Sequence, residues 1–187
     1  MSDAKPKRYA MAMDPSLCVG CNACVLACMG ENRTPDHGFR DWIVTETRGE
    51  FPHLSQEIRS ERCNHCSIAP CVSACPTGAS HVDDGGTVQV TRRKCTGCKA
   101  CIAACPYDAR YVHPEGFVDK CTFCLHRVQR GQDPACVSIC PTSALTFGDL
   151  SDPESPVSEV LLRRRHHVLL PEQGLRPNLF ILEKERT

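Results

Sequence analysis

The sequence lacks several features that would point to common classes of protein. No apolar run approaches the ~18 residues that a membrane-spanning helix needs, and no apolar stretch typical of a signal peptide follows the first basic residues. The 22 Lys and Arg residues balance 22 Asp and Glu residues, so the formal net charge is zero. We therefore expect no direct membrane span, no export signal of its own and no nucleic-acid partner.

Apolar side chains other than cysteine are also scarce. Hydrophobic residues make up 41% of the 187-residue chain, but 16 of them are cysteines, and without these about a third of the chain is apolar. A core this poor should depend on metal, because binding of a cluster contributes folding energy much as structural zinc does. We therefore expect no folded protein in the absence of metal.

The sixteen cysteines fall into four sets of four. Closely spaced thiolates followed by a further Cys after three residues are what a cubane 4Fe–4S cluster needs, and in two-cluster ferredoxins that last Cys binds the neighbouring cluster. The third set, CTGCKACIAACP, has the bacterial ferredoxin spacing throughout. The sets are Cys18, Cys21, Cys24 and Cys28; Cys63, Cys66, Cys71 and Cys75; Cys95, Cys98, Cys101 and Cys105; and Cys121, Cys124, Cys136 and Cys140.

Two other uses of cysteine compete with this interpretation. Zinc sites also use CxxC pairs, but one zinc ion needs two such pairs, whereas three of these sets continue beyond a pair and end in Cys-Pro. A disulfide scaffold of sixteen cysteines would belong to an exported protein, which would need a signal sequence. The sequence therefore favours iron–sulfur clusters over both.

The order of the sets predicts an α+β fold made of two bacterial ferredoxin-like modules. Residues 60–113 hold the second and third sets and form a complete two-cluster module. Residues 1–30 and 114–148 hold the first and fourth sets and form its split counterpart, into which the complete module is inserted. Such an internal repeat predicts a pseudo-twofold relation between the two cluster pairs.

Two pairs of short strands are expected between the ligands. Within the inserted module, residues 79–82 and 87–90 flank a Gly-rich turn and predict a β-hairpin. Residues 31–59 form a β excursion outside the modules, where a run that starts at Asp41 should pair with a second run near Leu54. The only tryptophan, Trp42, is expected to pack this pair, and the alternative is that it anchors a partner.

The last part of the chain predicts one further ligand-bearing helix and a separate tail. Residues 120–129 suit a helix that starts with the first two cysteines of the fourth set. Residues 149–187 contain no redox ligand, and we interpret them as a docking tail that clasps another subunit or the chain's own module. The tail should contain a helix with Ser155 as N-cap, ending near Arg165, and a strand at residues 179–182.

Charged and catalytic residues give less information. Four thiolates around a 4Fe–4S core leave a charge of roughly −2 per cluster, which basic residues beside the ligands would offset, raising the cluster potentials; the alternative is that they are solvated surface charges. His65 is expected either to donate a hydrogen bond to a cluster sulfur or to pack in its loop. No recognisable catalytic arrangement is present, so we expect a non-catalytic chain. The basic residues are Arg62, Arg92, Arg93, Lys94, Lys99 and Lys120.

The four sets in this order, with CNHCSIAPCVSACPTGA, CTGCKACIAACPYDARY and KCTFCLHR, resemble the four-cluster iron–sulfur subunit of the molybdopterin oxidoreductases of the dimethyl-sulfoxide-reductase type. The likeness to the electron-transfer subunit of polysulfide reductase is especially close. It covers nearly the full chain, including DPSLCVGCNAC near the start and PEQGLRPNLF in the tail. These motifs are specific for cluster ligation and for the subunit family, and much less so for the substrate.

The resemblance implies crossed ligation of four 4Fe–4S clusters. Some relatives replace one Cys of the third set and carry a 3Fe–4S centre, but Cys98 is present here, so four cubanes are expected. The implied ligands are Cys18, Cys21, Cys24 and Cys140 for cluster 1; Cys28, Cys121, Cys124 and Cys136 for cluster 2; Cys63, Cys66, Cys71 and Cys105 for cluster 3; and Cys75, Cys95, Cys98 and Cys101 for cluster 4.

The resemblance also implies a role as an electron relay. In that family the subunit lies between a molybdopterin catalytic subunit and an integral-membrane quinone-binding subunit, and we expect membrane association through these partners, on the extracytoplasmic face. A free-standing soluble polyferredoxin shuttle is the alternative. A third interpretation is a structural role in a complex whose catalytic subunit has lost its cofactor.

Overall fold

The chain folds into many short elements, which the computed structural model describes for residues 6–184. Residues 1–5 and 185–187, at the ends of the predicted split module and tail, lie outside the described residues. The mixed content agrees with an α+β class. The strands are β1 (Tyr9–Met13), β2 (Asp41–Glu50), β3 (His53–Arg62), β4 (Ser80–Val82), β5 (Val88–Val90), β6 (Tyr111–Val112), β7 (Val118–Asp119), β8 (Leu145–Asp149), β9 (His166–His167) and β10 (Leu179–Leu182). The helices are α1 (Ala23–Asn32), α2 (Pro70–Ser73), α3 (Ala100–Ala103), α4 (Leu125–Val128), α5 (Ala135–Ser138) and α6 (Pro156–Arg163), with 3₁₀ turns η1 (Arg92–Lys94) and η2 (Pro171–Gln173).

The lengths of the ligand-bearing helices follow from the residue after the last cysteine of each set. In the second, third and fourth sets this residue is Pro76, Pro106 and Pro141, respectively. The residue before a proline avoids the helical region. The helices of these sets, α2, α3 and α5, therefore stop after four residues. The first set has Met29 instead, and α1 continues to Asn32. The departure from Cys-Pro thus gives a helix of ten residues.

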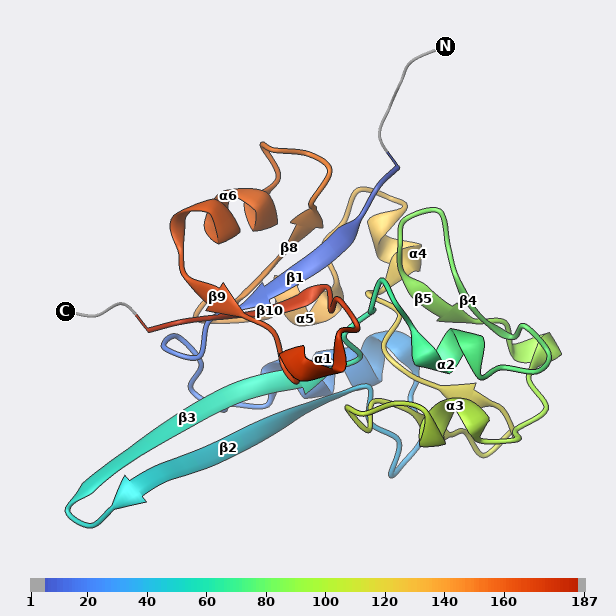
Figure 1. Cartoon of the computed structure of the whole chain (residues 1–187), viewed down its shortest axis with the longest axis horizontal. Helices are drawn as coiled ribbons and strands as arrows, with labels where there is room; N and C mark the ends of the chain where they lie inside the picture. Colours follow the sequence, from blue (N-terminus) through green and yellow to red (C-terminus); the bar gives the residue numbers. More distant parts are fainter. Residues whose placement is uncertain (1–5, 185–187) are drawn as a thin grey trace.

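A four-stranded sheet in the order β8-β1-β10-β9 ties the two ends of the chain together (Figure 1). Strand β1 pairs in parallel with β10 and antiparallel with β8. Alternate residues of β1 face opposite sides, so Ala10 and Ala12 pack with Val157 of α6, while Met11 and Met13 belong to the core that surrounds the cysteines. The sheet therefore separates α6 from the ligand-bearing region.

The predicted tail elements are present. Ser155 precedes α6 as N-cap, although its side chain makes no capping bond within the described residues, and the helix ends at Arg163, two residues before the predicted end. Strand β10 occupies residues 179–182 as predicted and lies inside the chain's own sheet. This part of the tail therefore packs against β1 of the same chain, and docking by the tail stays a prediction.

The excursion forms a long hairpin that projects from the body as an arm (Figure 1). Its strands pair antiparallel as predicted and are longer than the predicted runs, because the pairing extends from Asp41 opposite Arg62 to Glu50 opposite His53. The root is buried, and half-buried Trp42 packs against the core. The tip is exposed, so only the root contributes to the ligand region.

One predicted helix is wrong over half its length. The segment 120–129 is helical only in α4, after both cysteines. Phe123 and Cys124 have φ values of 52° and 48°, which a right-handed helix does not accommodate. This loop instead points the backbone N–H of Phe123 at the Sγ of Cys121, at 3.4 Å. The predicted hairpin at 79–90 is confirmed as β4 and β5.

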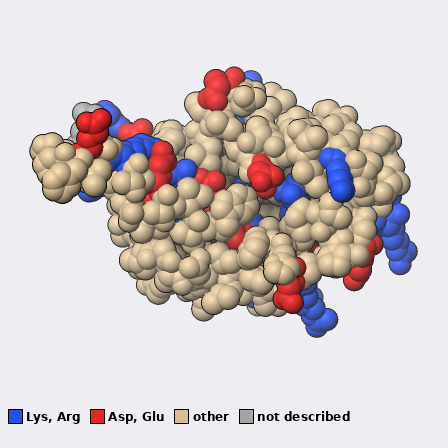
Figure 2. Space-filling view, turned by 90° about the horizontal axis from the view of Figure 1, so that it is seen from below, with Lys and Arg blue, Asp and Glu red and all other residues tan. Residues whose placement is uncertain are grey.

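The surface carries charges of both signs. On the face in Figure 2, acidic and basic side chains are interspersed, and neither sign forms a continuous patch. On the arm, Arg59 pairs with Glu46, Glu57 and Glu61. Across residues 6–184, no helix combines the length and the apolar character that crossing a bilayer requires.

Candidate metal centre

Three cavities are each lined by four cysteines that come from two different sets. In every case three cysteines of one set meet the last cysteine of another. All sixteen cysteines lie within the described residues and are free thiols, so no disulfide joins any two of them. The first cavity is lined by Cys18, Cys21, Cys24 and Cys140, the second by Cys28, Cys121, Cys124 and Cys136, and the third by Cys63, Cys66, Cys71 and Cys105.

The four remaining cysteines lie around α2 and α3, and we refer to this group as the fourth site. The thiol of Cys101 interacts electrostatically with those of Cys75 and Cys95, and Cys98 is exposed on the loop that leads into α3. Helices α2 and α3 pack together beside the third cavity and the fourth site, as α1 and α5 do beside the first two cavities.

Repeated backbone geometry shapes the ligand loops. Gly20 and Gly97 occupy equivalent positions in the first and third sets, and both have φ of +67°, which L-residues with a Cβ adopt at a cost. A Cβ at Gly97 would also collide with the carbonyl oxygen of Gly116. Two positions later, Asn22 and Lys99 have φ of 61° and 64°. The loops therefore curve in the same way at both sets.

Hydrogen bonds to sulfur also recur where the sequence reads Cys-Pro-Thr. The backbone N–H of Ser80 donates to the Sγ of Cys75 at 3.3 Å, and that of Ala144 donates to the Sγ of Cys140 at 3.3 Å. The bond from Ser80 is the main cause that lowers the pKa of Cys75 to about 7. Backbone donors thus favour thiolates at the last cysteines of the second and fourth sets.

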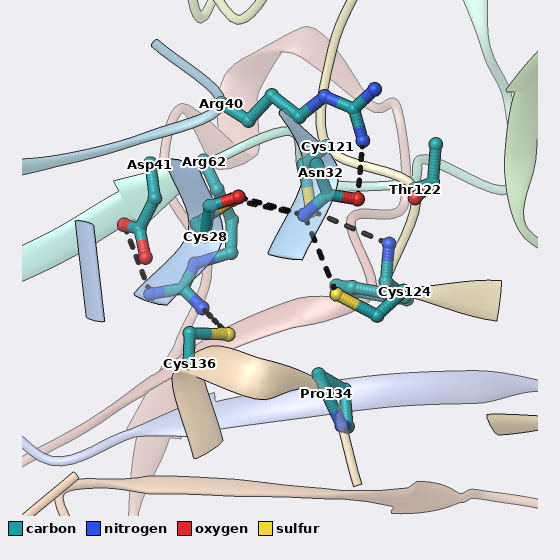
Figure 3. A pocket seen from close by; sticks show the side chains of 11 residues that line it. Cys28, Asn32, Arg40, Asp41, Arg62, Cys121, Thr122, Cys124, Pro134 and Cys136 are labelled. Atoms are coloured by element: carbon teal, nitrogen blue, oxygen red, sulfur yellow. Dashed lines mark hydrogen bonds and ion pairs between the residues drawn. The ribbon is translucent and has the colours of Figure 1, made fainter. Parts of the chain in front are cut away.

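The second cavity has a polar wall (Figure 3). The amide nitrogen of Asn32 lies 3.6 Å from the Sγ of Cys28 and 3.8 Å from that of Cys124. Arg40 holds this amide by donating from Nη1 to its Oδ1 at 2.8 Å. Arg40 is in turn fixed by Asp119, which accepts from its Nε at 2.9 Å and its Nη2 at 2.8 Å.

An arginine lies against a thiol at the second cavity and again at the third. Arg62 donates from Nη1 to the Sγ of Cys136 at 2.9 Å, and Arg110 donates from Nη2 to the Sγ of Cys71 at 2.8 Å. Both residues are almost fully buried. Their guanidinium groups bring positive charge to the sites where thiolates would gather.

The cavity walls also contain donors without a partner. Among residues 6–184, the Nε of Arg62, the Nε and Nη1 of Arg110, and the Nδ2 of Asn64 have no hydrogen-bond partner. Buried donors of this kind are costly unless an acceptor is present. Sulfide and thiolate acceptors of an iron–sulfur cluster would satisfy them, so the walls fit this cofactor.

The thiols themselves fit the same cofactor. Burial is the main cause that raises the pKa of Cys66 and of Cys121 to about 12, and that of Cys136 to about 11. Metal coordination deprotonates such thiols outright. Within residues 6–184, no three His, Cys, Asp or Glu side chains are placed to hold a single ion. The cysteines surround cavities, which is the arrangement that a multi-atom cluster requires.

The basic residues singled out from the sequence separate into two groups. Arg62 and Lys120 are buried beside the thiols, whereas the remaining basic residues of the prediction are exposed. The ring of His65 stacks on Phe123 and its Nδ1 accepts the N–H of Val88 at 3.0 Å. Its Nε2 has no partner among the described residues, so a hydrogen bond from it to a cluster sulfur stays a prediction. The exposed basic residues are Arg92, Arg93, Lys94 and Lys99.

Sequence reasoning missed several residues of the walls. Asn32 follows Cys28 by four positions on α1, a spacing that places both on one helix face and could have revealed it. Arg110 follows the third set in the motif CPYDAR, but its distance from Cys71 along the chain gives no local signal.

Comparison with known families agrees with this chemistry. Residues 10–76 match one family described as a 4Fe-4S dicluster domain, and residues 54–150 match a second family of the same description. Two dicluster domains account for four 4Fe–4S clusters, and sixteen cysteines supply the four thiolates that each cluster needs. The chain therefore carries four 4Fe–4S clusters.

Curated relatives match nearly the whole chain. The B subunit of polysulfide reductase from Wolinella succinogenes is 46% identical, covering 96% of this chain and 96% of its own length. The NrfC homolog of Haemophilus influenzae is 46% identical over 94% of this chain and 80% of its own length. The thiosulfate reductase electron transfer subunit PhsB of Salmonella typhi is 44% identical over 79% of each chain. This protein thus belongs to the family of four-cluster iron–sulfur electron-transfer subunits of dimethyl-sulfoxide-reductase-type respiratory oxidoreductases.

Proposed function

We propose that the chain relays single electrons between a molybdopterin catalytic subunit and an integral-membrane quinone-binding subunit. Each bound cluster supplies one-electron redox chemistry. The relatives named as subunits of polysulfide and thiosulfate reductases support a place in such a complex. The chain itself is non-catalytic in this proposal, and its side chains hold, order and shield the redox centres.

The proposed ligand sets follow the grouping of the cysteines. Cluster 1 takes the four cysteines of the first cavity, cluster 2 those of the second and cluster 3 those of the third. Cluster 4 takes the four cysteines of the fourth site. The division into an inserted module (60–113), a split module (1–30 and 114–148), an excursion (31–59) and a tail (149–187) belongs to the same proposal.

The solvent exposure of the cysteines is the observation that best supports an electron relay. Within the described residues, the only exposed cysteines are Cys21, in the set for cluster 1, and Cys98, in the set for cluster 4. All four cysteines for cluster 2 are buried, as are three of the four for cluster 3. A relay needs access at its two ends and exclusion of water in its middle, and this distribution provides both.

Contacts between neighbouring groups support the order 1-2-3-4. The thiols of Cys24 and Cys136 interact electrostatically across the first two cavities, and those of Cys63 and Cys121 interact across the second and third. Arg110 interacts with cysteines of the third cavity and of the fourth site. Each group is therefore adjacent to the next.

We propose that cluster 1 faces the catalytic subunit and cluster 4 the quinone-binding subunit, on the extracytoplasmic side of the membrane. In this proposal the arm and α6 are the elements that contact the partners. Phe51 at the tip of the arm and Leu162 on α6 are both 88% exposed.

Purification of the native complex tests this function. The chain should copurify from solubilised membranes with a molybdenum-containing subunit and an integral membrane protein, and a quinol analogue should reduce its clusters. Recovery as a soluble monomer without partners would instead identify a polyferredoxin shuttle. Copurification with a catalytic subunit that contains no metal cofactor would point to the structural role. Protease treatment of intact spheroplasts, which should cleave the chain, tests the side of the membrane.

A further inference from the structure

Four cationic side chains are buried among residues 6–184, and all four lie beside cysteines: Arg40, Arg62, Arg110 and Lys120. Two of them are neutralised by a carboxylate. Arg40 pairs with Asp119 at 2.8 Å, and Arg62 pairs with Asp41 at 3.2 Å. Neither Arg110 nor Lys120 forms an ion pair with a carboxylate in the described part of the chain. The buried cations therefore differ in the net positive charge that they bring to the neighbouring cysteines.

Arg62 and Arg110 share two kinds of hydrogen-bond partner, although Arg62 also donates to the Sδ of Met11 at 3.1 Å. Each guanidinium donates to the thiol of the third cysteine of a set and to a serine hydroxyl: Arg62 to Cys136 and Ser60, Arg110 to Cys71 and Ser80. Figure 3 shows Arg62 between Cys136 and Asp41.

The two environments act on different cysteines. Asp41 and Arg62 exert opposite electrostatic effects on Cys24 and Cys136, which belong to the first and second cavities. Arg110 acts on Cys71 of the third cavity and Cys101 of the fourth site. Lys120 adds positive charge beside Cys63 and Cys71 of the third cavity and beside Cys121 of the second. Its Nζ is held by the carbonyl oxygens of Val88 and Cys121.

Reduction adds a negative charge to a cluster. A buried cation without a counterion stabilises the reduced state, whereas a cation beside a carboxylate contributes little net charge. Since water cannot screen charges at buried positions as it does at the surface, the effect of Arg110 should extend to both groups that it contacts.

We propose that Arg110 raises the reduction potentials of the clusters at the third cavity and the fourth site, assisted at the third cavity by Lys120, while Asp41 cancels the corresponding effect of Arg62 at the first two cavities. The chain would thereby set an electrostatic difference between its two cluster pairs. This inference rests on the proposed ligand sets. In this inference Arg110 and Asp41 place charge near the clusters and contact no substrate.

Redox titration of the full cluster-loaded chain, followed by EPR, tests the inference. Arg110→Gln should lower the midpoint potentials of two of the four signals, with at least a tenfold change in the reduction equilibrium, equivalent to ~59 mV for one electron. Arg110→Lys keeps the charge and should retain most of the wild-type values. Asp41→Asn should raise the potentials of the other two signals. Serine variants of Cys71 and Cys136 assign signals to the two pairs.

The inference is overturned if Arg110→Gln retains full iron and sulfide yet leaves the potentials unchanged, or shifts all four signals equally. If Arg110→Gln loses its clusters, Asp41→Asn decides: a rise confined to the pair near Cys136 supports the inference, and no rise overturns it. A wild-type chain without labile sulfide would contradict the proposed ligand sets, and the inference with them. Full clusters with unshifted potentials would contradict the inference alone.

Discussion

At the scale of single residues, the wall of the second cavity depends on a buried ion pair that lies behind Asn32. Asp119 accepts from Arg40 and from the hydroxyl of Tyr111 at 2.7 Å. Arg40 in turn orients Asn32 toward two thiols. The pair is buried on both sides, with side-chain exposures of 6% and 9%. Loss of Arg40 would leave the buried carboxylate of Asp119 without an opposite charge.

We expect Arg40→Met to destabilise the cluster-loaded protein by ~3–5 kcal/mol, the usual cost of leaving one member of a buried pair alone. The measurement is the temperature at which the visible absorbance of the clusters is lost. Arg48→Met is the matched control, because Arg48 pairs with Glu46 at the exposed surface of the arm, where ion pairs contribute little. Equal behaviour of the two variants would contradict a structural role for the Arg40–Asp119 pair.

The sequence could reveal the cysteines but only part of their surroundings. Cysteine spacing is a local signal, and it is sufficient to identify the cofactor. Asp41 and Arg62 are 21 positions apart and meet only because of the register of β2 and β3. Arg110 reaches Cys71 across 39 positions. Such partners depend on the fold, which a search for local motifs does not supply.

At the scale of elements, one face of α1 lines two cavities. Cys24 lines the first cavity and Cys28, one helical turn later, lines the second. The helix can carry both because no proline follows Cys28. The arrangement of its two thiols can be tested directly.

Crossed ligation predicts which serine variants behave alike. Cys28→Ser and Cys121→Ser should perturb the same EPR signal, because both thiols line the second cavity. Cys24→Ser should perturb the signal of the neighbouring cluster, because its thiol lines the first. If Cys24→Ser and Cys28→Ser alter one and the same signal, the proposed ligand sets are wrong.

The helices and strands that were predicted correctly are those that a strong local sequence pattern marks. Both hairpins and the final strand could be predicted because a turn or an apolar run marks each of them. The helix expected at 120–129 fails at its start because Phe123 and Cys124 have left-handed conformations and the backbone N–H of Phe123 is directed at the Sγ of Cys121. Ligand geometry there overrides helix propensity.

At the scale of the whole molecule, the core and the cofactor sites are the same region. The largest buried cluster of side chains contains Cys24, Cys63, Cys121 and Cys136 together with the apolar residues of the central sheet. Removal of iron would leave four groups of thiols, most of them buried, and several unpaired donors at the centre of the fold.

Iron removal should therefore unfold most of the chain. The loaded protein should contain about sixteen iron and about sixteen labile sulfide, four of each per cubane. Treatment with a chelator should abolish the far-ultraviolet signal of the sheet and increase the hydrodynamic radius, because binding energy and folding energy are coupled at such sites. The control is protein that has been treated with the same chelator and then exchanged into buffer with excess iron and sulfide. A compact, sheet-containing apo-protein would contradict this dependence.

The proposed orientation gives the last prediction, because two loops of the same shape lie at the two ends of the relay. Lys99 is exposed and follows Cys98, while Asn22 is exposed and follows Cys21, and both residues have the same left-handed backbone. If cluster 4 meets the quinone-binding partner, Lys99→Glu should slow reduction of the clusters by a quinol analogue, since it places a negative charge beside the acceptor. Rapid mixing, followed by the loss of visible absorbance, measures this step.

Asn22→Glu is the matched control at the opposite end, and it should leave reduction by quinol unchanged while slowing transfer to the catalytic subunit. Neither variant should affect turnover with a dye that reaches the catalytic subunit directly, because that reaction bypasses the relay. The reverse pattern, with Asn22→Glu slowing reduction by quinol and Lys99→Glu leaving it unchanged, would place cluster 1 beside the quinone and overturn the proposed orientation. Because the two loops share one backbone conformation, a difference between these variants reports their positions in the complex rather than a local distortion.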